Sequence, residues 1–432
     1  QYKSKLIMKS YNLKYFVVLL IVFLISANLA WLNPRNNDPD KPRLYKTHNT
    51  IPLFWQYNLD AGIEILTAAY FPKIFKKDNL RIDRPTYPAL VNFLGKTTGL
   101  ILKPFVNLNK LERAGIGYII LKILIYSSSI ILARKILLNY FDEKTTFLAI
   151  FFTYANSHSI FYFTAFHTTE LQFITPIFIL FMFIYLIKNY SIIKNILFSI
   201  IVGILMLAKP NYATYLAVII FLLYKKEWSI ILISIFAHLI PIFLYISLMK
   251  YLDYNFQLKT ATEFDQGSWL YEDLKNGNIY NVLKIAFLLI GEFFIRILLA
   301  YKLIIIIFSI FGFLLKYSID KIKTDYLVFI GIFIFCTYFQ MFVASRYVYY
   351  MTYDISIIIF SFAAFGIYQI TDKFKNSNVK KFLIPTIMAS YLIFNVVTFI
   401  QYPWVHPYKQ IAKTPEALNA HLSKYDNIII KD

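Results

Sequence analysis

The sequence predicts an all-α polytopic membrane protein. Hydrophobic residues make up 58% of its 432 residues and charged residues only 16%, whereas a soluble chain of this length carries roughly 25% charged residues. The apolar residues fall in continuous blocks of about 18–22 residues, long enough to cross a bilayer as helix. Backbone groups in lipid need internal hydrogen-bond partners, and the apolar content of each block does not alternate, so helices are expected and a β-barrel is not.

Eleven such blocks are expected to span the membrane. The predicted spans are 15–32, 114–133, 145–164, 170–187, 193–208, 211–224, 228–249, 298–316, 326–344, 351–370 and 382–400.

Lysine and arginine positions predict how these spans are oriented. With the N-terminus in the cytoplasm, the basic residues gather in alternate short loops, as expected for cytoplasmic loops. The opposite short loop at 157–169 has no Lys or Arg. The predicted cytoplasmic cations are Lys3, Lys5, Lys9, Lys14, Arg134, Lys135, Lys144, Lys188, Lys194, Lys225, Lys226, Lys316, Lys321, Lys323, Lys373, Lys375, Lys380 and Lys381.

Three larger segments then lie on the non-cytoplasmic side of a single transmembrane domain, 1–432. The first, 33–113, is too long for a connector, and its apolar-periodic stretches 63–75 and 90–102 predict interfacial helices. The second, 250–297, ends in another predicted interfacial helix at 281–297. The third is a short tail, 401–432. The first apolar block lacks a small-residue cleavage site and is expected to be an anchor, with Met8 as the start.

Charge and cysteine content narrow the function classes. The formal charge of +20 could indicate nucleic acid, but the cations lie at the ends of apolar blocks, so no nucleic-acid partner is expected. Cys336 is the only cysteine, which excludes an intramolecular disulfide. The histidines do not form an HxxxH or HExxH pattern, so a metal site has no support in the sequence; no cofactor is expected, and a divalent cation stays open. There is no phosphate-binding Gly-rich loop for a nucleotide sugar.

The first outer segment, 33–113, contains the polar residues that are best suited to catalysis. Asp60 follows Tyr57-Asn-Leu, and Arg84 opens the element Arg84-Pro-Thr-Tyr87-Pro88. Proline fixes its own φ and biases the preceding residue toward extended backbone, so Arg84 should sit on a defined, non-helical segment. Arginine holds phosphate or carboxylate through a planar fork. An acid and a cation are therefore predicted close to one membrane face.

These motifs resemble the GT-C superfamily of integral membrane glycosyltransferases, of the mannosyltransferase and arabinosyltransferase kind, which use polyprenyl-phosphate sugar donors. The resemblance implies that Asp60 is the catalytic base and that Arg84, Tyr87 and Pro88 form the following R-x-x-Y-P-like element. It also implies that Glu170, after His167-Thr-Thr, opens the fourth span. The basic turn Lys209-Pro-Asn and the later Arg346-Tyr347 are similar to family elements too, although arginine is commoner at the position of Lys209.

The resemblance implies transfer of a sugar from a lipid-linked donor to a glycan, lipid or protein acceptor outside the cytoplasm. Asp60 would act as base, and Arg84, Tyr87, Glu170, Lys209, Arg346 and Tyr347 would bind the donor phosphate or substrate. The expected setting is a bacterial inner membrane, in cell-envelope glycan biosynthesis, with the site facing the periplasm and the chain surrounded by membrane lipids.

Structural roles stay open for the same residues. Asp60 could be a helix cap, with Asp38, Asp40 and Asp83 as rival bases; Arg84 could be a snorkelling cation, and Glu170 a favourable charge at a helix N-terminus. His158 and His167 are further candidates, as is an acceptor-binding lip of Glu263, Asp265 and Trp269. The alternative function is a transporter or flippase of lipid-linked glycans, or their polymerase. A transporter should place ionisable groups at mid-membrane, and the predicted spans are mostly uncharged at their centres.

Overall fold

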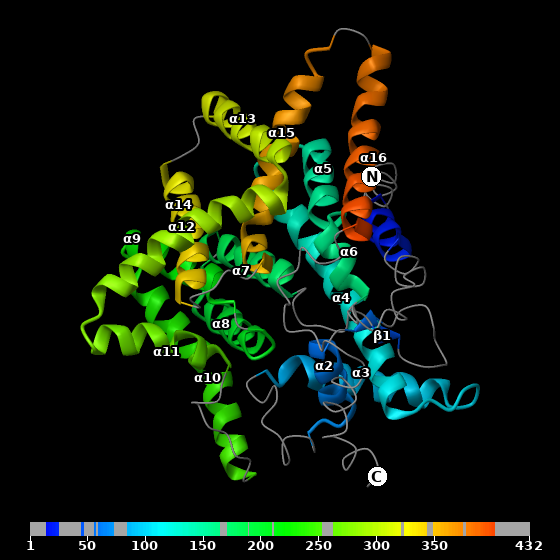
Figure 1. The fold of residues 1–432 in the computed structure, drawn as a ribbon, viewed down its shortest axis with the longest axis vertical. Helices are drawn as coiled ribbons and strands as arrows, with labels where there is room; N and C mark the ends of the chain where they lie inside the picture. The colour runs from blue at the N-terminus through cyan, green and yellow to red at the C-terminus, as the bar shows by residue number, and fades with distance from the viewer. Residues whose placement is uncertain are drawn as a thin grey trace.

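The protein is helical throughout nearly all of the residues that the structure describes. The computed structural model describes residues 14–25, 45–46, 56–57, 59–72, 84–164, 171–188, 190–209, 211–252, 262–320, 324–343, 349–374 and 377–401. Two short strands, β1 (Tyr45–Lys46) and β2 (Gln56–Tyr57), pair antiparallel. Helices α15 (Ser356–Thr371) and α16 (Ser377–Gln401) run along the length of the molecule, and α2 (Leu59–Ala69) and α3 (Thr86–Leu102) lie together toward its lower end (Figure 1).

The helices have the following bounds. A first helix covers Lys14–Ile25. It is followed by α2 (Leu59–Ala69), α3 (Thr86–Leu102), α4 (Lys110–Leu137), α5 (Glu143–Tyr154), α6 (Ser157–Thr164), α7 (Leu171–Lys188), α8 (Ile192–Met206), α9 (Tyr212–Tyr224), α10 (Trp228–Tyr251), α11 (Thr262–Lys275), α12 (Ile279–Tyr301), α13 (Leu303–Asp320), α14 (Thr324–Val343), the 3₁₀ helix η4 (Tyr349–Ile355), α15 (Ser356–Thr371) and α16 (Ser377–Gln401).

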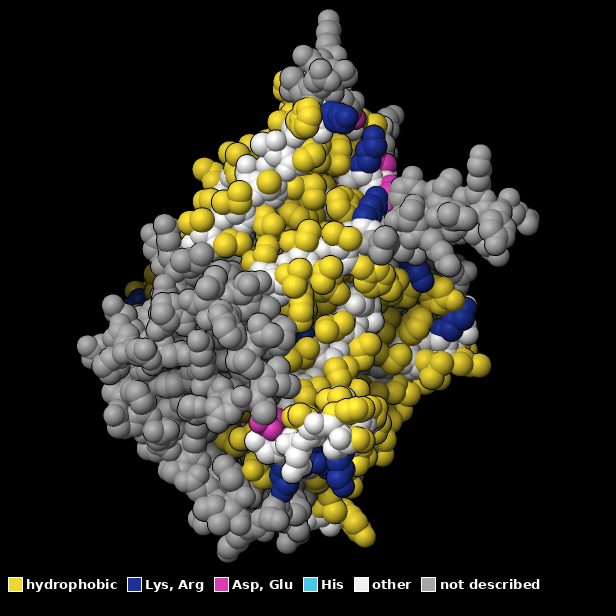
Figure 2. Space-filling model, turned by 90° about the vertical axis from the view of Figure 1, so that its right-hand side faces the viewer, with side chains coloured by type: hydrophobic (Ala, Val, Ile, Leu, Met, Phe, Trp, Pro, Cys, Tyr) yellow, Lys and Arg dark blue, Asp and Glu magenta, His cyan; other side chains and the backbone are white. Residues whose placement is uncertain are grey.

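Several of these helices are long and apolar enough to cross a membrane. Within the described residues five pass this test: α4, α10, α14, the continuous stretch Thr352–Thr371 and the stretch Lys381–Thr398. A sixth candidate is the pair α12 and α13, which bends by 97°. Apolar side chains cover much of the described surface seen in Figure 2, as lipid contact requires. The chain is therefore an integral membrane protein of helices, and the count of eleven spans stays a prediction.

The segment predicted as one span over 145–164 is divided into two helices. Asn156 lies at the division, where its Oδ1 accepts from the backbone amide of Ser159 at 2.8 Å. The backbone amide of Ser157 donates to Oδ1 of Asn395, on α16, at 2.9 Å. Asparagine side chains of this kind compete with the helical hydrogen bonds of the backbone. They end α5 and start α6, which the apolar content of the stretch could not indicate.

Glycines bring two pairs of helices into backbone contact. A Cβ atom on Gly95 of α3 would overlap the carbonyl oxygen of Arg113 on α4, and one on Gly117 of α4 would overlap that of Val91 on α3. The same holds between α13 and α15 at Gly312, opposite the carbonyl of Phe362. Small residues at such crossings let helix backbones approach closely in membranes. Helices α3 and α4 therefore form a close-packed pair at the end of the bundle that holds α2.

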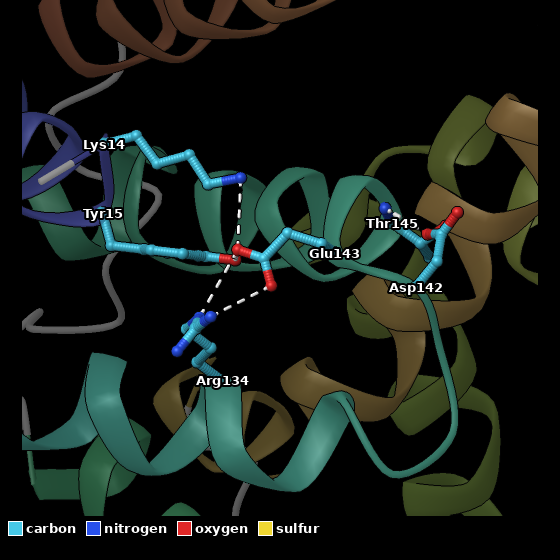
Figure 3. A network of polar contacts seen from close by, with 6 residues as sticks. All are labelled: Lys14, Tyr15, Arg134, Asp142, Glu143 and Thr145. Carbon is cyan, nitrogen blue, oxygen red and sulfur yellow. Dashed lines mark hydrogen bonds and ion pairs between the residues drawn. The ribbon is translucent and has the colours of Figure 1, made fainter. Parts of the chain in front are cut away.

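An ionic network ties the first helix to the opposite end of the bundle (Figure 3). Glu143, the first residue of α5, accepts a 2.8 Å hydrogen bond from the Tyr15 hydroxyl and lies 3.2 Å from Nη2 of Arg134 on α4. Lys14 lies 3.2 Å from the same carboxylate. Desolvation raises the pKa of Glu143, but the hydrogen bonds from Tyr15, Arg134 and Lys14 outweigh it, so that pKa lies below its ordinary value of 4.5.

This network predicts a pH-dependent contribution to stability. A lowered pKa in the folded state means that the contribution of Glu143 is fully present above about pH 4.5 and is lost as the pH falls through the folded-state pKa. Glu143→Gln should therefore lower the thermal midpoint at pH 7, by an amount matching about 1 kcal/mol. The gap between wild type and variant should close below pH 4. Glu227→Gln is the matched control, because that exposed N-cap makes no side-chain cap bond; a constant gap for Glu143→Gln down to pH 3 would contradict the prediction.

Candidate functional site

Three helices, α2, α3 and α4, and the ends of three others, α7, α8 and α10, meet around one apolar cluster at the α2 end of the bundle. Asn92 of α3 donates from Nδ2 to the carbonyl of Ala68 at 2.6 Å, which fixes the end of α2 against α3. The α2–α4 cluster, as we call it, consists of the buried residues Ile65, Leu66, Ala68, Ala69, Tyr70, Tyr87, Val91, Ala114, Tyr118, Leu121, Leu171, Ala208 and Met249.

Four buried charged residues adjoin this cluster along the chain. Glu64 precedes Ile65 of the cluster, Lys122 follows Leu121, and Lys209 follows Ala208; Arg84 lies one turn before Tyr87. Each is at most 5% exposed. Burying a charged group is costly unless it is compensated, and ionisable residues inside membrane proteins usually serve a function. The surroundings of the α2–α4 cluster are therefore the strongest candidate site within the described residues.

Arg84 and Lys209, which are distant in sequence, lie on adjacent backbone segments. The backbone amide of Thr86 donates to the carbonyl of Leu207 at 3.3 Å, and this bond joins the start of α3 to the turn after α8. Pro85 precedes α3 with φ −75°. Both cations were predicted from the sequence as phosphate-binding residues. The structure places them on backbone segments that are hydrogen-bonded to each other at the same end of the bundle.

Tyr87 and Asp60 occupy different settings. Tyr87 is 1% exposed and its ring centroid lies 5.5 Å from that of Tyr118, so it packs inside the α2–α4 cluster. Its role in binding substrate stays a prediction, beside the packing role that its position gives it. Asp60 lies in the first turn of α2, one turn before Glu64. Helix α2 packs on both α3 and α4, so the backbone of Asp60 belongs to the same end of the bundle.

The remaining predicted site residues fall outside the described residues. These are Glu170, Arg346 and Tyr347, together with the candidate His167; Glu263 and Asp265 lie in α11, but their side chains are outside the description. Their proposed roles stay predictions. Trp269, the third residue of the predicted lip, donates from Nε1 to the carbonyl of Val343 at 2.8 Å. This bond fastens α11 to the end of α14.

Buried polar residues also connect the turn after Lys209 to η4. Asn211, two residues after Lys209, donates from Nδ2 to Oδ1 of Asp354 at 2.8 Å, and Asp354 is 1% exposed. His158 of α6 stacks on the ring of Tyr353, with centroids 4.3 Å apart and planes 9° from parallel. The turn between α8 and α9 thus links the α2–α4 cluster to η4. His158, predicted as a base or metal ligand, packs on an aromatic ring here.

Sequence reasoning missed three of these buried charges: Glu64, Lys122 and Asp354. The sequence signal that could have identified them is a single ionisable residue inside an otherwise apolar stretch. Lys122 lies near the middle of α4, a candidate span, although the centres of the spans were expected to be mostly uncharged. Among the described residues, no group of three or more His, Cys, Asp and Glu is placed to hold a metal ion.

Comparisons with known proteins find likenesses among solved structures alone. No family model matches the sequence, and no curated protein matches it. Among solved structures, the chain is similar to the archaeal oligosaccharyltransferase AglB from Archaeoglobus fulgidus, in complex with an inhibitory peptide and a dolichol-phosphate. The TM-score is 0.47 and the sequence identity 14%, over 96% of this chain and 59% of that chain. This chain thus matches about three-fifths of the length of AglB, and a likeness of that degree assigns neither family nor function.

Proposed function

We propose that the protein is a GT-C-like glycosyltransferase that moves a sugar from a polyprenyl-phosphate donor to an acceptor. The observation that supports this most is the burial of Arg84 and Lys209 on segments joined by the Thr86–Leu207 backbone bond. Helix α2, whose second residue is the predicted base Asp60, packs on α3 and α4 at the same end of the bundle. The family-like motifs at these positions agree with the same assignment.

The cations suit a phosphate leaving group. In an inverting displacement, an acceptor hydroxyl transfers its proton to Asp60 as its oxygen bonds to the anomeric carbon. The bond from that carbon to the phosphate oxygen breaks, and the phosphate leaves with the electron pair. Arg84 offers a planar fork and Lys209 a compact charge to the oxygen that gains negative charge. Fixed charges in a water-poor site stabilise such a transition state without reorganisation.

The membrane setting suits the other part of the donor. A polyprenyl chain needs an apolar surface beside the site, and helices α4 and α10 are both long, apolar and partly exposed. The alternation of Lys and Arg along the chain favours a site on the non-cytoplasmic side. A bacterial inner membrane, with a glycan, lipid or protein acceptor, remains our proposal for the setting.

A donor panel tests the proposal, with Arg84→Lys as the informative variant. Purified protein in lipid is given radiolabelled polyprenyl-phosphate sugars, and transfer or slow donor hydrolysis is measured. Arg84→Lys keeps the charge and loses the fork, so the rate should fall about tenfold. Arg113→Lys, at the start of α4 on the same end of the bundle, is the matched control and should retain the wild-type rate. Equal rates in all three proteins would remove Arg84 from the site.

A transporter of lipid-linked glycans is the second candidate, and Lys122 is the observation that favours it. Transporters place ionisable groups near the middle of the membrane, and Lys122 is buried near the middle of α4. If no donor is turned over but one moves across the bilayer of a proteoliposome, this candidate replaces the enzyme.

A further inference from the structure

A cavity at the opposite end of the bundle lies between the first helix and α4. Its volume is about 170 Å³. It adjoins the last two turns of α4, whereas the α2–α4 cluster adjoins the first half of that helix, and it takes no part in the proposed transfer of sugar. It is lined by Tyr15, Phe16, Ile130, Ile131, Arg134 and Lys135.

The lining has an apolar part and a cationic part. Phe16 and Ile131 are both exposed large hydrophobic residues, so a hydrocarbon chain lying against them would shield apolar surface of both helices. Arg134 and Lys135 stand in the last turn of α4. The negative end of the helix dipole stabilises cations at this position. The cavity thus joins an apolar face of two membrane helices to two positive charges at the helix end.

The two cations are held differently. Glu143 fixes the guanidinium of Arg134, with Nη2 at 3.2 Å and Nε at 3.4 Å from its two carboxylate oxygens (Figure 3). Lys135 is exposed and has no ion pair within the described residues; its ammonium lies 5.9 Å from the ring centroid of Phe181. The network therefore orients one cation, and the neighbouring lysine still has its charge available to a ligand.

The surrounding charge is positive. The carboxylate of Asp142 points away from the cavity and caps α5, accepting from the amide of Thr145 at 2.8 Å (Figure 3). Glu143 is already engaged by three groups. The cations near this end, Lys14, Arg134, Lys135 and Lys144, outnumber those two carboxylates. An anion is therefore favoured here over a neutral or cationic ligand.

We propose that this cavity binds an anionic phospholipid. Its phosphate would lie against Lys135 and Arg134, and one acyl chain would follow Phe16 and Ile131. A lipid is the ligand class that meets both parts of the lining, because free phosphate would leave the apolar part uncovered. Basic pockets between helices at a membrane surface recognise anionic head groups by this chemistry. Binding of such a lipid does not depend on the proposed sugar transfer.

The test measures lipid binding to the full chain. Protein purified in a neutral detergent is titrated with dioleoylphosphatidylglycerol, dioleoylphosphatidylcholine or glycerol 3-phosphate, and bound lipid is counted by native mass spectrometry. Wild type should bind phosphatidylglycerol in preference to phosphatidylcholine. Lys135→Gln should weaken that binding about fivefold, the effect of one cation near a lipid surface. Lys144→Gln removes the same charge at the start of α5, outside the cavity lining, and should leave binding at the wild-type level.

Three other results would overturn the proposal. Equal weakening by Lys135→Gln and Lys144→Gln would indicate diffuse attraction to that end of the protein. Binding of glycerol 3-phosphate as tight as that of the lipid would show that the apolar lining takes no part. Equal binding of phosphatidylglycerol and phosphatidylcholine by wild type would remove the role of charge. Lys135→Arg should bind like wild type, which separates loss of charge from loss of fold.

Discussion

Asp60→Asn is expected to lower the rate of sugar transfer by about 10²- to 10⁴-fold, the usual contribution of a general base. Asparagine has nearly the same shape as aspartate but cannot accept the proton of the acceptor hydroxyl. Donor binding, which we assign to Arg84 and Lys209, should be kept. The measurement is transfer from the active donor of the panel, beside donor binding by equilibrium dialysis, in wild type and variant.

The same substitution at other acids of the outer segment provides the comparison. Asp38→Asn, Asp40→Asn and Asp83→Asn remove one carboxylate each from the region in which Asp60 lies. If Asp60 is the base, these three variants should transfer sugar at the wild-type rate. Full activity in Asp60→Asn, with activity lost in one of the others, would move the base to that residue.

The second large effect is expected at the crossing of α13 and α15. A Cβ atom on Gly312 would overlap the carbonyl oxygen of Phe362 and would lie 2.8 Å from the amide nitrogen of Gly366. Backbone atoms cannot move aside as a flexible side chain can, so Gly312→Ala should separate the two helices. The expected loss is about 1–3 kcal/mol of stability, as for overpacking elsewhere. A lower thermal midpoint of the purified protein, followed by tryptophan fluorescence, measures it.

Two other glycines separate this clash from the effect of alanine itself. Gly291 in α12 and Gly331 in α14 have no atom within 4 Å of an added Cβ. Alanine favours a helix over glycine by about 1 kcal/mol, so Gly291→Ala and Gly331→Ala should leave the midpoint unchanged or raise it. A midpoint for Gly312→Ala as high as theirs would show that α13 and α15 are not in backbone contact.

Long apolar stretches allowed the sequence to predict many of the helices. The stretch 228–249 corresponds to α10 and 326–344 to α14, because hydropathy over about twenty residues depends little on neighbours. The helix predicted at 281–297 corresponds to α12. The bend of 97° between α12 and α13 falls at Lys302, inside the predicted span 298–316, and that position could not be predicted. Lys302 lies at that bend with φ 68°. A positive φ is uncommon for a residue other than glycine, so tertiary contacts, not local sequence, determine it.

The candidate site could be predicted only in part. Arg84 and Lys209 each precede a proline at the end of an apolar stretch, so the local sequence identified them as candidate site residues. Lys122 carries no such mark, because a lysine in an apolar helix could equally extend toward the membrane surface. Which face of α4 is covered depends on α2 and α3, which come from a separate part of the chain. The hydrogen bond between Asn211 and Asp354 joins residues 143 positions apart, and no local sequence pattern predicts such a pair.

The glycine contact between α3 and α4 has a consequence for the energetics of the proposed sugar transfer. Since the two backbones touch at Gly95 and Gly117, the start of α3, with Arg84, has little freedom to shift along α4. The charges around the cluster are then arranged once, when the chain folds. If the chain transfers sugar as we propose, an arriving donor would meet cations already in position, so its binding would order little of the protein and lose correspondingly little entropy.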